Sequence, residues 1–269
     1  MWQHMKNKPI IKTIGTGEPC VVLIGGMHGD EKVGIKVLKC AENLKNIKGT
    51  LKLIIANPPA LVKNKRFIDA DLNRMFPGKV NGNKEERLAF EILKEIKNAD
   101  YVLDFHSCSV ESKPFCIIRN KKSLKESFRT GLSHYVLLPL KKQGGKSCID
   151  FTKCGIGLEL GRHNSIKTIN AGRKALINFL SSAGTIKERM ITKKSQKNIF
   201  KIIGAIPKDK SVIVNRKVNN FKLISKNSTI GEKKGVKIKS KRDFYPILYG
   251  ERAYDNILTF IGKKVSINV

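Results

Sequence analysis

One stretch of the sequence decides the fold: Val21-Val22-Leu23-Ile24-Gly25-Gly26-Met27-His28-Gly29-Asp30-Glu31. Its apolar run and paired glycines predict a buried strand that ends in a tight turn. The apolar spacing of residues 31–44 then predicts a helix. A histidine and a glutamate three residues apart at such a turn can point at one zinc ion. We therefore expect a strand–turn–helix unit that presents His28 and Glu31 beyond the end of a strand.

A second apolar run supplies a third metal ligand. It is Tyr101-Val102-Leu103-Asp104-Phe105-His106, and it ends in a histidine. Two histidines and one glutamate leave a coordination position for water, which is the layout of a hydrolytic rather than a structural zinc site. The sequence therefore predicts a zinc hydrolase that binds one Zn²⁺ per chain through His28, Glu31 and His106.

Asp104 shares one face of this strand with His106, because side chains two residues apart in a strand point the same way. Its carboxylate could hydrogen-bond the metal-binding imidazole and orient it. An ordinary acid at a strand end is an equally good interpretation of Asp104 taken alone.

Apolar runs alternate with helical patterns through the first two thirds of the chain. Strands are expected at residues 21–26, 51–56, 101–105, 114–118 and 155–160, and helices at 31–44, 85–97 and 166–182. This alternation predicts an α/β protein with an open, largely parallel sheet flanked by helices. Ligands of such sheets bind beyond the carboxyl ends of the strands, where His28 and His106 both lie.

The pattern changes near residue 190. Short strands are expected at 200–203, 221–224, 236–238, 245–248 and 257–261, separated by turns rich in Gly, Asn and Lys. We therefore predict a zinc-dependent catalytic domain at residues 1–190 and a small C-terminal all-β domain at 191–269.

The net charge is strongly positive, with 53 Lys and Arg against 22 Asp and Glu and a formal value of +31. Nucleic acid is one partner that such a charge suggests. However, the basic clusters alternate with apolar residues, as in a strand with one solvated face, and few aromatic residues are interleaved as a stacking platform would need. We expect a solvated basic surface that attracts small anionic substrates rather than nucleic acid.

Several protein classes are disfavoured. No apolar run approaches the roughly 18–20 residues that span a bilayer, so we expect no membrane partner. The polar start and the six cysteines without C-x-x-C spacing indicate a cytoplasmic protein with reduced thiols. A homo-oligomer is compatible with the sequence.

Other residues could complete a hydrolytic site. Glu159 is the lone acid of an apolar run, and burial would raise its pKa towards the range useful for proton transfer. Arg66, Asn73 and Arg74 lie in a polar segment, 66–78, that is too long for a simple turn. An edge-strand acid and a salt-bridged surface loop are the alternatives for these residues taken singly. Together with the metal ligands, in this order, they favour a site.

The chain resembles the aspartoacylase and succinylglutamate desuccinylase family, zinc deacylases with a carboxypeptidase-like fold. Four blocks carry the resemblance, in order across residues 20–182: Gly26-Met27-His28-Gly29-Asp30-Glu31, Asp69-Ala70-Asp71-Leu72-Asn73-Arg74, Asp104-Phe105-His106 and Gly157-Leu158-Glu159-Leu160-Gly161. Near the C-terminus, Tyr245-Pro246-Ile247 and Glu251-Arg252-Ala253-Tyr254 are also similar to the family.

The resemblance implies a role for each residue. Glu159 would be the general base and acid, and Arg66 would polarise the scissile carbonyl. Asn73 and Arg74 would hold the carboxylate of the substrate's amino-acid half, and Tyr254 would reach the substrate from the β domain. That domain would then narrow the pocket and cover the active site.

One departure from the family concerns the arginine expected shortly before the general base, which reads a second substrate carboxylate. Between Leu138 and Glu159 the basic residues are all lysines: Lys141, Lys142, Lys146 and Lys153. Lys146 could substitute as a point charge, without the bidentate fork of an arginine.

The sequence thus predicts a zinc amidohydrolase that cleaves a small anionic N-acyl amino acid, similar to N-acetylaspartate or N-succinylglutamate. A carboxypeptidase acting on short peptides is one alternative. A basic nucleic-acid-associated protein with a vestigial metal site is another.

Overall fold

A ten-stranded mixed sheet forms the centre of the protein, whose computed structural model describes residues 7–138, 146–187 and 196–267. The strand order is β1-β3-β2-β4-β7-β5-β6-β8-β13-β12. The strands of this sheet are β1 (Ile10–Ile14), β2 (Cys20–Gly25), β3 (Thr50–Ile55), β4 (Tyr101–Cys108), β5 (Phe115–Ile118), β6 (His134–Leu137), β7 (Gly155–Arg162), β8 (Asn198–Pro207), β12 (Tyr245–Ile247) and β13 (Ile257–Val265).

The strands that position the site are parallel. β2 pairs in parallel with β3 and β4, and β4 pairs in parallel with β7. In this register His106 lies opposite Glu159. Because parallel strands end at the same edge of a sheet, the carboxyl ends of β2, β4 and β7 come together there, where the sequence predicted a site.

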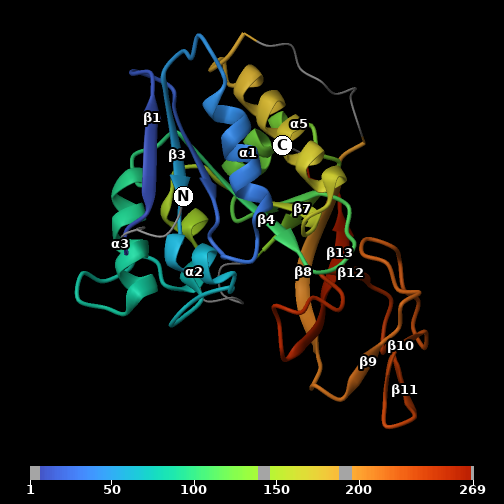
Figure 1. Ribbon diagram of the computed structural model, residues 1–269. Helices are drawn as coiled ribbons and strands as arrows, with labels where there is room; N and C mark the ends of the chain where they lie inside the picture. The colour runs from blue at the N-terminus through green and yellow to red at the C-terminus, as the bar shows by residue number, and fades with distance from the viewer. Residues whose placement is uncertain (1–6, 139–145, 188–195, 268–269) are drawn as a thin grey trace.

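Helices cover both faces of the sheet. They are α1 (Val33–Glu42), α2 (Pro58–Lys63), α3 (Lys84–Ile96), α4 (Lys121–Ser127) and α5 (Ile166–Ser182). Figure 1 shows α1 and α5 side by side on one face, with α3 on the other side of the molecule. One core cluster joins α1 and α5 to the sheet through residues such as Val37 and Leu176, and a second joins α3 through Leu88 and Ile92. The fold class predicted from the sequence is confirmed.

The C-terminal strands extend the main sheet. β8, β13 and β12 form its last three positions, and a separate antiparallel sheet contains β9 (Val212–Val214), β10 (Thr229–Lys233) and β11 (Val236–Lys239). This small sheet lies beyond the end of the main body in Figure 1. The predicted domain boundary at 190/191 lies outside the described residues, and the two-domain division stays a prediction.

The strand predicted at 221–224 was wrong. Phe221 has a φ of 64°, which breaks the extended backbone, and Ile224 forms only an isolated bridge with Phe244. The apolar character of Phe221 has another origin, because its ring packs against Phe115, His134 and Phe200.

No helix within the described ranges has the length and apolar character needed to cross a membrane. All six cysteines are free thiols.

Candidate active site

Two glycines shape the turn that carries the first two predicted ligands. Gly26 has a φ of 69°, a conformation that favours glycine, and redirects the chain as β2 ends. Gly29 lies so close to α2 that a Cβ atom there would be 2.1 Å from the carbonyl carbon of Ala60. Its N–H donates to the carbonyl of Arg66. Gly26 and Gly29 thus allow the loop after β2 to place His28 and Glu31 against the segment that follows α2.

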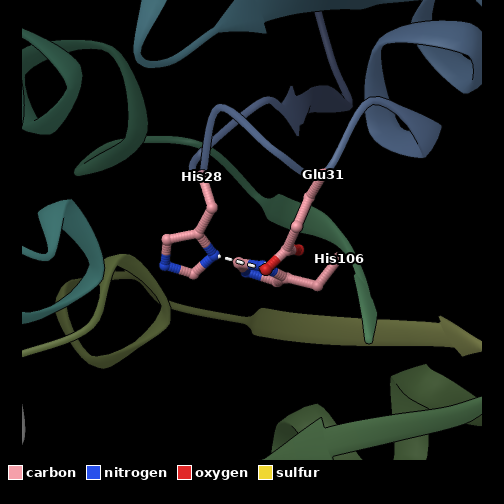
Figure 2. A group of neighbouring side chains, drawn as sticks. All are labelled: His28, Glu31 and His106. Carbon is pink, nitrogen blue, oxygen red and sulfur yellow. Dashed lines mark hydrogen bonds and ion pairs between the residues drawn. The ribbon is translucent and has the colours of Figure 1, made fainter. Parts of the chain in front are cut away.

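His28, Glu31 and His106 converge in the structure (Figure 2), each offering one ligand atom within 4.8 Å of the others. All three residues are buried. Glu31 Oε1 lies 2.8 Å from His28 Nδ1, and Glu31 Oε2 lies 3.1 Å from His106 Nδ1. Two imidazole nitrogens and a carboxylate are a donor set that suits zinc, so these residues fit the metal that the sequence predicted.

The other nitrogen of each imidazole contacts a second carboxylate. His106 Nε2 lies 2.7 Å from Asp104 Oδ2, as predicted for Asp104, and His28 Nε2 lies 3.0 Å from Asp71 Oδ1. Such contacts fix the ring orientation, and the Nδ1 atom of each ring faces Glu31. Asp71 was not assigned this role from the sequence, although it stands two residues before Asn73 in the same motif.

These contacts shift the pKa values of the cluster. Burial disfavours the charged forms, but Asp104 and Glu31 outweigh it and raise the pKa of His106 well above its usual value. Burial likewise opposes the ionisation of Glu31, yet the two histidines hold the pKa of its carboxyl well below the usual range. The side chain of Glu31 is therefore an ionised carboxylate in this cluster.

Arg66 reaches the same cluster. Its Nη1 donates to Glu31 Oε1 at 3.1 Å, and its Nη2 donates to Asp71 Oδ2 at 3.0 Å. Burial works against the guanidinium charge, but Glu31 and Asp71 raise the pKa of Arg66 above its ordinary value. A fixed cation therefore stands beside the three predicted ligands.

A buried carboxylate holds the loop that carries Arg66, Asn73 and Arg74. Glu85, on α3, accepts hydrogen bonds from three consecutive backbone amides, those of residues 68–70, at 2.7, 3.0 and 3.2 Å. The Nδ2 atom of Asn73 lies 3.3 Å from His106 Nε2, and its Oδ1 accepts a hydrogen bond from the N–H of Cys148. The loop is therefore built into the site rather than lying on the surface.

Glu159 lies on β7 and lines the cavity. Its Oε2 is buried and has no hydrogen-bond partner among the described residues. Burial raises the pKa of Glu159 to about 7. The charge of His106 opposes this shift, and the charge of Glu31 adds to it. A carboxyl group with this pKa can take up and return a proton near neutral pH.

The cavity brings together most of the predicted site residues. It measures about 680 Å³, mouth included, and its walls contain the predicted residues His28, Glu31, Arg66, Asn73, Arg74, Asp104, His106, Glu159 and Tyr254. Tyr254 comes from the loop between β12 and β13. Lys146 is exposed, and its carbonyl accepts from the N–H of Phe76. Its side chain is not one of the described groups lining this cavity, and its proposed role stays a prediction.

Other wall residues were not identified from the sequence as part of the site. They are Ser107, Cys108, Ile117, Arg119, Leu138, Ser147, Ile149, Gly157, Leu248, Glu251 and Ala253. Two sequence features could have pointed to residues of this group. Arg119 directly follows β5, and Glu251 stands in the same short motif as Tyr254.

The fold and the site define a class of protein: an α/β enzyme of the hydrolytic type. It has a buried His-Glu-His group, a candidate metal site, at the carboxyl ends of the parallel strands of its sheet. Residues 18–183 match the succinylglutamate desuccinylase/aspartoacylase catalytic domain. The chain belongs to this family of zinc amidohydrolases, and its buried His28, Glu31 and His106 fit the family's zinc site.

Individual relatives are distant. A probable aspartoacylase of Prochlorococcus marinus is 22% identical over 293 residues, which cover 91% of this chain and 92% of the relative. A probable aspartoacylase of Acaryochloris marina is 27% identical over 128 residues, and this alignment spans only 43% of either protein. The crystal structure of succinylglutamatedesuccinylase/aspartoacylase from Rhodobacter sphaeroides superimposes with a TM-score of 0.77 at 19% identity, covering 95% of this chain and 89% of that one. That likeness shows the fold.

Proposed function

We propose that this protein hydrolyses a small N-acyl amino acid to a carboxylate and a free amino acid. The observation that carries the proposal is the buried, unpartnered oxygen of Glu159 in one cavity with Arg66 and the His-Glu-His group. Hydrolysis of an amide needs a proton carrier, a cation near the developing oxyanion and a Lewis acid. The names of the Prochlorococcus and Acaryochloris relatives agree with such a reaction.

Zinc held by His28, Glu31 and His106 would polarise the scissile carbonyl and activate water. Glu159 takes one proton from the attacking water as the oxygen–carbon bond forms. Arg66 offsets the negative charge that develops on the carbonyl oxygen. Glu159 then gives its proton to the amide nitrogen as the carbon–nitrogen bond breaks, so that the free amine leaves.

Asn73 and Arg74 are proposed to hold the α-carboxylate of the substrate. Arg74 lines the cavity, and its Nη1 donates to the carbonyl of Asn73 at 2.7 Å, which fixes the guanidinium at the wall. A guanidinium can bind a carboxylate through two parallel hydrogen bonds. Tyr254 stands in the same wall and would close the pocket over a small substrate rather than a peptide.

The test is release of free amine from a panel of N-acetyl and N-succinyl amino acids by zinc-loaded protein, with chelated protein as the control. The panel also contains dipeptides with free and blocked carboxyl ends. Chelator-sensitive turnover of N-acyl amino acids is expected. Turnover of dipeptides alone would instead make the protein a carboxypeptidase, and no turnover by zinc-loaded protein would refute the proposed reaction.

A further inference from the structure

Among the residues that the structure describes, the cationic side chains in the cavity wall match one substrate carboxylate, not two. The described part of the wall contains three guanidinium groups, those of Arg66, Arg74 and Arg119. Arg66 already pairs with Glu31 and Asp71, and Arg119 already pairs with Asp150. Across residues 7–138, 146–187 and 196–267, Arg74 forms no ion pair, so it is the guanidinium left for a substrate anion.

The pair of Arg119 and Asp150 is buried and held from both sides. The two side chains are 6% and 3% exposed, and Arg119 Nε lies 2.8 Å from Asp150 Oδ1. Arg119 Nη1 also donates to the carbonyl of Leu138. Asp150 Oδ2 accepts from Ser147 N at 2.9 Å and from Ser147 Oγ at 2.6 Å. A substrate carboxylate that drew Arg119 away would leave Asp150 buried without its counter-ion, which is strongly unfavourable.

The cavity reaches this pair along one face of the sheet. Gly157 and Glu159 lie two residues apart on β7 and so face the same side. In the sheet Gly157 lies opposite Ile117, two residues before Arg119. A Cβ atom on Gly157 would be 3.3 Å from Ile117 Cβ and 3.8 Å from Ile149 Cδ1. Ile117, Ile149 and Gly157 therefore give the cavity wall an apolar stretch, and the same cavity is lined by Glu159 and Arg119.

The residues proposed to anchor the amino-acid half of the substrate lie on this side of the cavity. Asn73, proposed to bind the α-carboxylate, accepts a hydrogen bond from Cys148 N at 3.1 Å. Cys148 belongs to the same short helical segment, η4 (Cys148–Phe151), as Asp150. A substrate anchored at Asn73 and Arg74 therefore has its side chain, rather than its acyl group, near Arg119.

We propose that the Arg119–Asp150 pair closes the side-chain end of the pocket and selects N-acyl amino acids with an uncharged side chain. The inference rests on the proposed function, and it departs from the acidic side chain that the family resemblance suggested. A second carboxylate at this end meets a guanidinium that is already neutralised, apolar walls and the nearby charge of Asp150. An uncharged side chain meets none of these costs.

Two isosteric pairs of compounds test the selection: N-acetylglutamine against N-acetylglutamate, and N-acetylasparagine against N-acetylaspartate. We expect kcat/KM of the zinc-loaded enzyme to be at least about tenfold higher for the amide member of each pair. An equal or higher value for the acidic members would overturn the inference while leaving the proposed function in place.

The substitution Asp150→Asn tests the role of the pair itself. Asparagine keeps the shape and can still accept from Ser147, but it leaves the charge of Arg119 unbalanced. We expect the ratio of kcat/KM for the acidic over the amide member to rise at least about tenfold. Asp209→Asn, at an exposed position between β8 and β9, is the matched control and should leave the ratio unchanged. An unchanged ratio in Asp150→Asn would overturn the inference.

A binding measurement tests the selection of the side chain independently of the proposed hydrolysis. Calorimetric titration of zinc-loaded Glu159→Gln protein with N-acetylglutamine and N-acetylglutamate needs no turnover. Tighter binding of N-acetylglutamine supports the selection, even if no acyl amino acid is hydrolysed and the proposed function fails. Equal or tighter binding of N-acetylglutamate, or binding of neither compound, overturns it.

Discussion

The carboxylate of Glu251 accepts two hydrogen bonds of 2.8 Å from one residue, Ser109, which donates from both its backbone N–H and its Oγ. The two residues are 142 positions apart in the sequence. Ser109 directly follows β4, the strand of His106, and Glu251 lies in the loop between β12 and β13 that contains Tyr254. The C-terminal wall of the cavity is therefore fastened to the strand that carries a metal ligand.

Glu251→Gln should loosen this wall. The amide offers one acceptor where the carboxylate offers two, so a buried donor loses its partner, which costs about 1–3 kcal/mol of unfolding free energy. We expect KM to rise severalfold, because Tyr254 is no longer held, while the zinc content stays that of the wild type. Steady-state kinetics, denaturant unfolding and metal analysis measure the three quantities. Glu111→Gln, at an exposed site, is the control. A wild-type KM and a wild-type stability in Glu251→Gln would show that the contact between Glu251 and Ser109 does not hold Tyr254 in place.

Glu85→Gln should disturb the loop of Arg66, Asn73 and Arg74. The carboxylate that accepts from three consecutive amides becomes a group with one acceptor and one donor, and charged hydrogen bonds of this kind contribute about 1.5–3 kcal/mol each. We expect lower stability together with a raised KM. Glu91→Gln on the same helix contacts solvent and Lys94, and it should change neither quantity. A variant that is less stable but has an unchanged KM would limit Glu85 to a structural role.

The local pattern of apolar residues was sufficient to predict much of the fold. Helix α5 has the predicted bounds, 166–182, because its apolar spacing is regular and Gly184 follows it. Helix α1 begins at Val33 rather than at 31, because Glu31 is held in the preceding turn, where its N–H donates to the carbonyl of His28. The edge strand β1 was missed, since its isoleucines lie at a largely exposed edge and show no alternation of burial.

The site residues that the sequence revealed are those in compact motifs, and the others depend on distant partners. The role of Arg119 depends on its ion pair with Asp150, 31 residues later, and its position after a strand is only a weak signal when taken alone. Glu85 binds backbone amides, which have no signature in the sequence. It is one of two acids in the first turn of α3, where exposed acids are common, yet it is fully buried.

Glu159→Gln should separate metal binding from turnover. Glutamine has nearly the same shape but cannot carry the proton, and loss of a positioned general acid–base group lowers rates by about 10²- to 10⁴-fold. Zinc content and the thermal midpoint should stay close to those of the wild type, because Glu159 is not one of the three predicted ligands. Single-turnover kinetics with metal analysis is the measurement. Turnover within threefold of the wild type would remove Glu159 from the mechanism.

His134, which does not line the cavity, should make the stability of the protein depend on pH. Its ring is buried and stacked on Phe200. Burial, then the charges of Lys113 and Lys264, lower its pKa to about 4. In the unfolded chain the imidazole titrates near its ordinary value of about 6.5. Between these two values only the unfolded chain takes up the proton, so the free energy of unfolding falls as the pH drops from about 6.5 to about 4.

The substitution His134→Phe keeps an aromatic ring and removes this titration. The wild type should lose about 1–2 kcal/mol more than the variant between pH 7 and pH 4.5, less than the full pKa difference implies because solvent partly screens the two lysines. Urea unfolding of both proteins at several pH values gives the comparison, and the carboxylates that also titrate in this range cancel between them. Parallel curves for the two proteins would mean that the ring of His134 is protonated as readily in the folded state as in the unfolded chain.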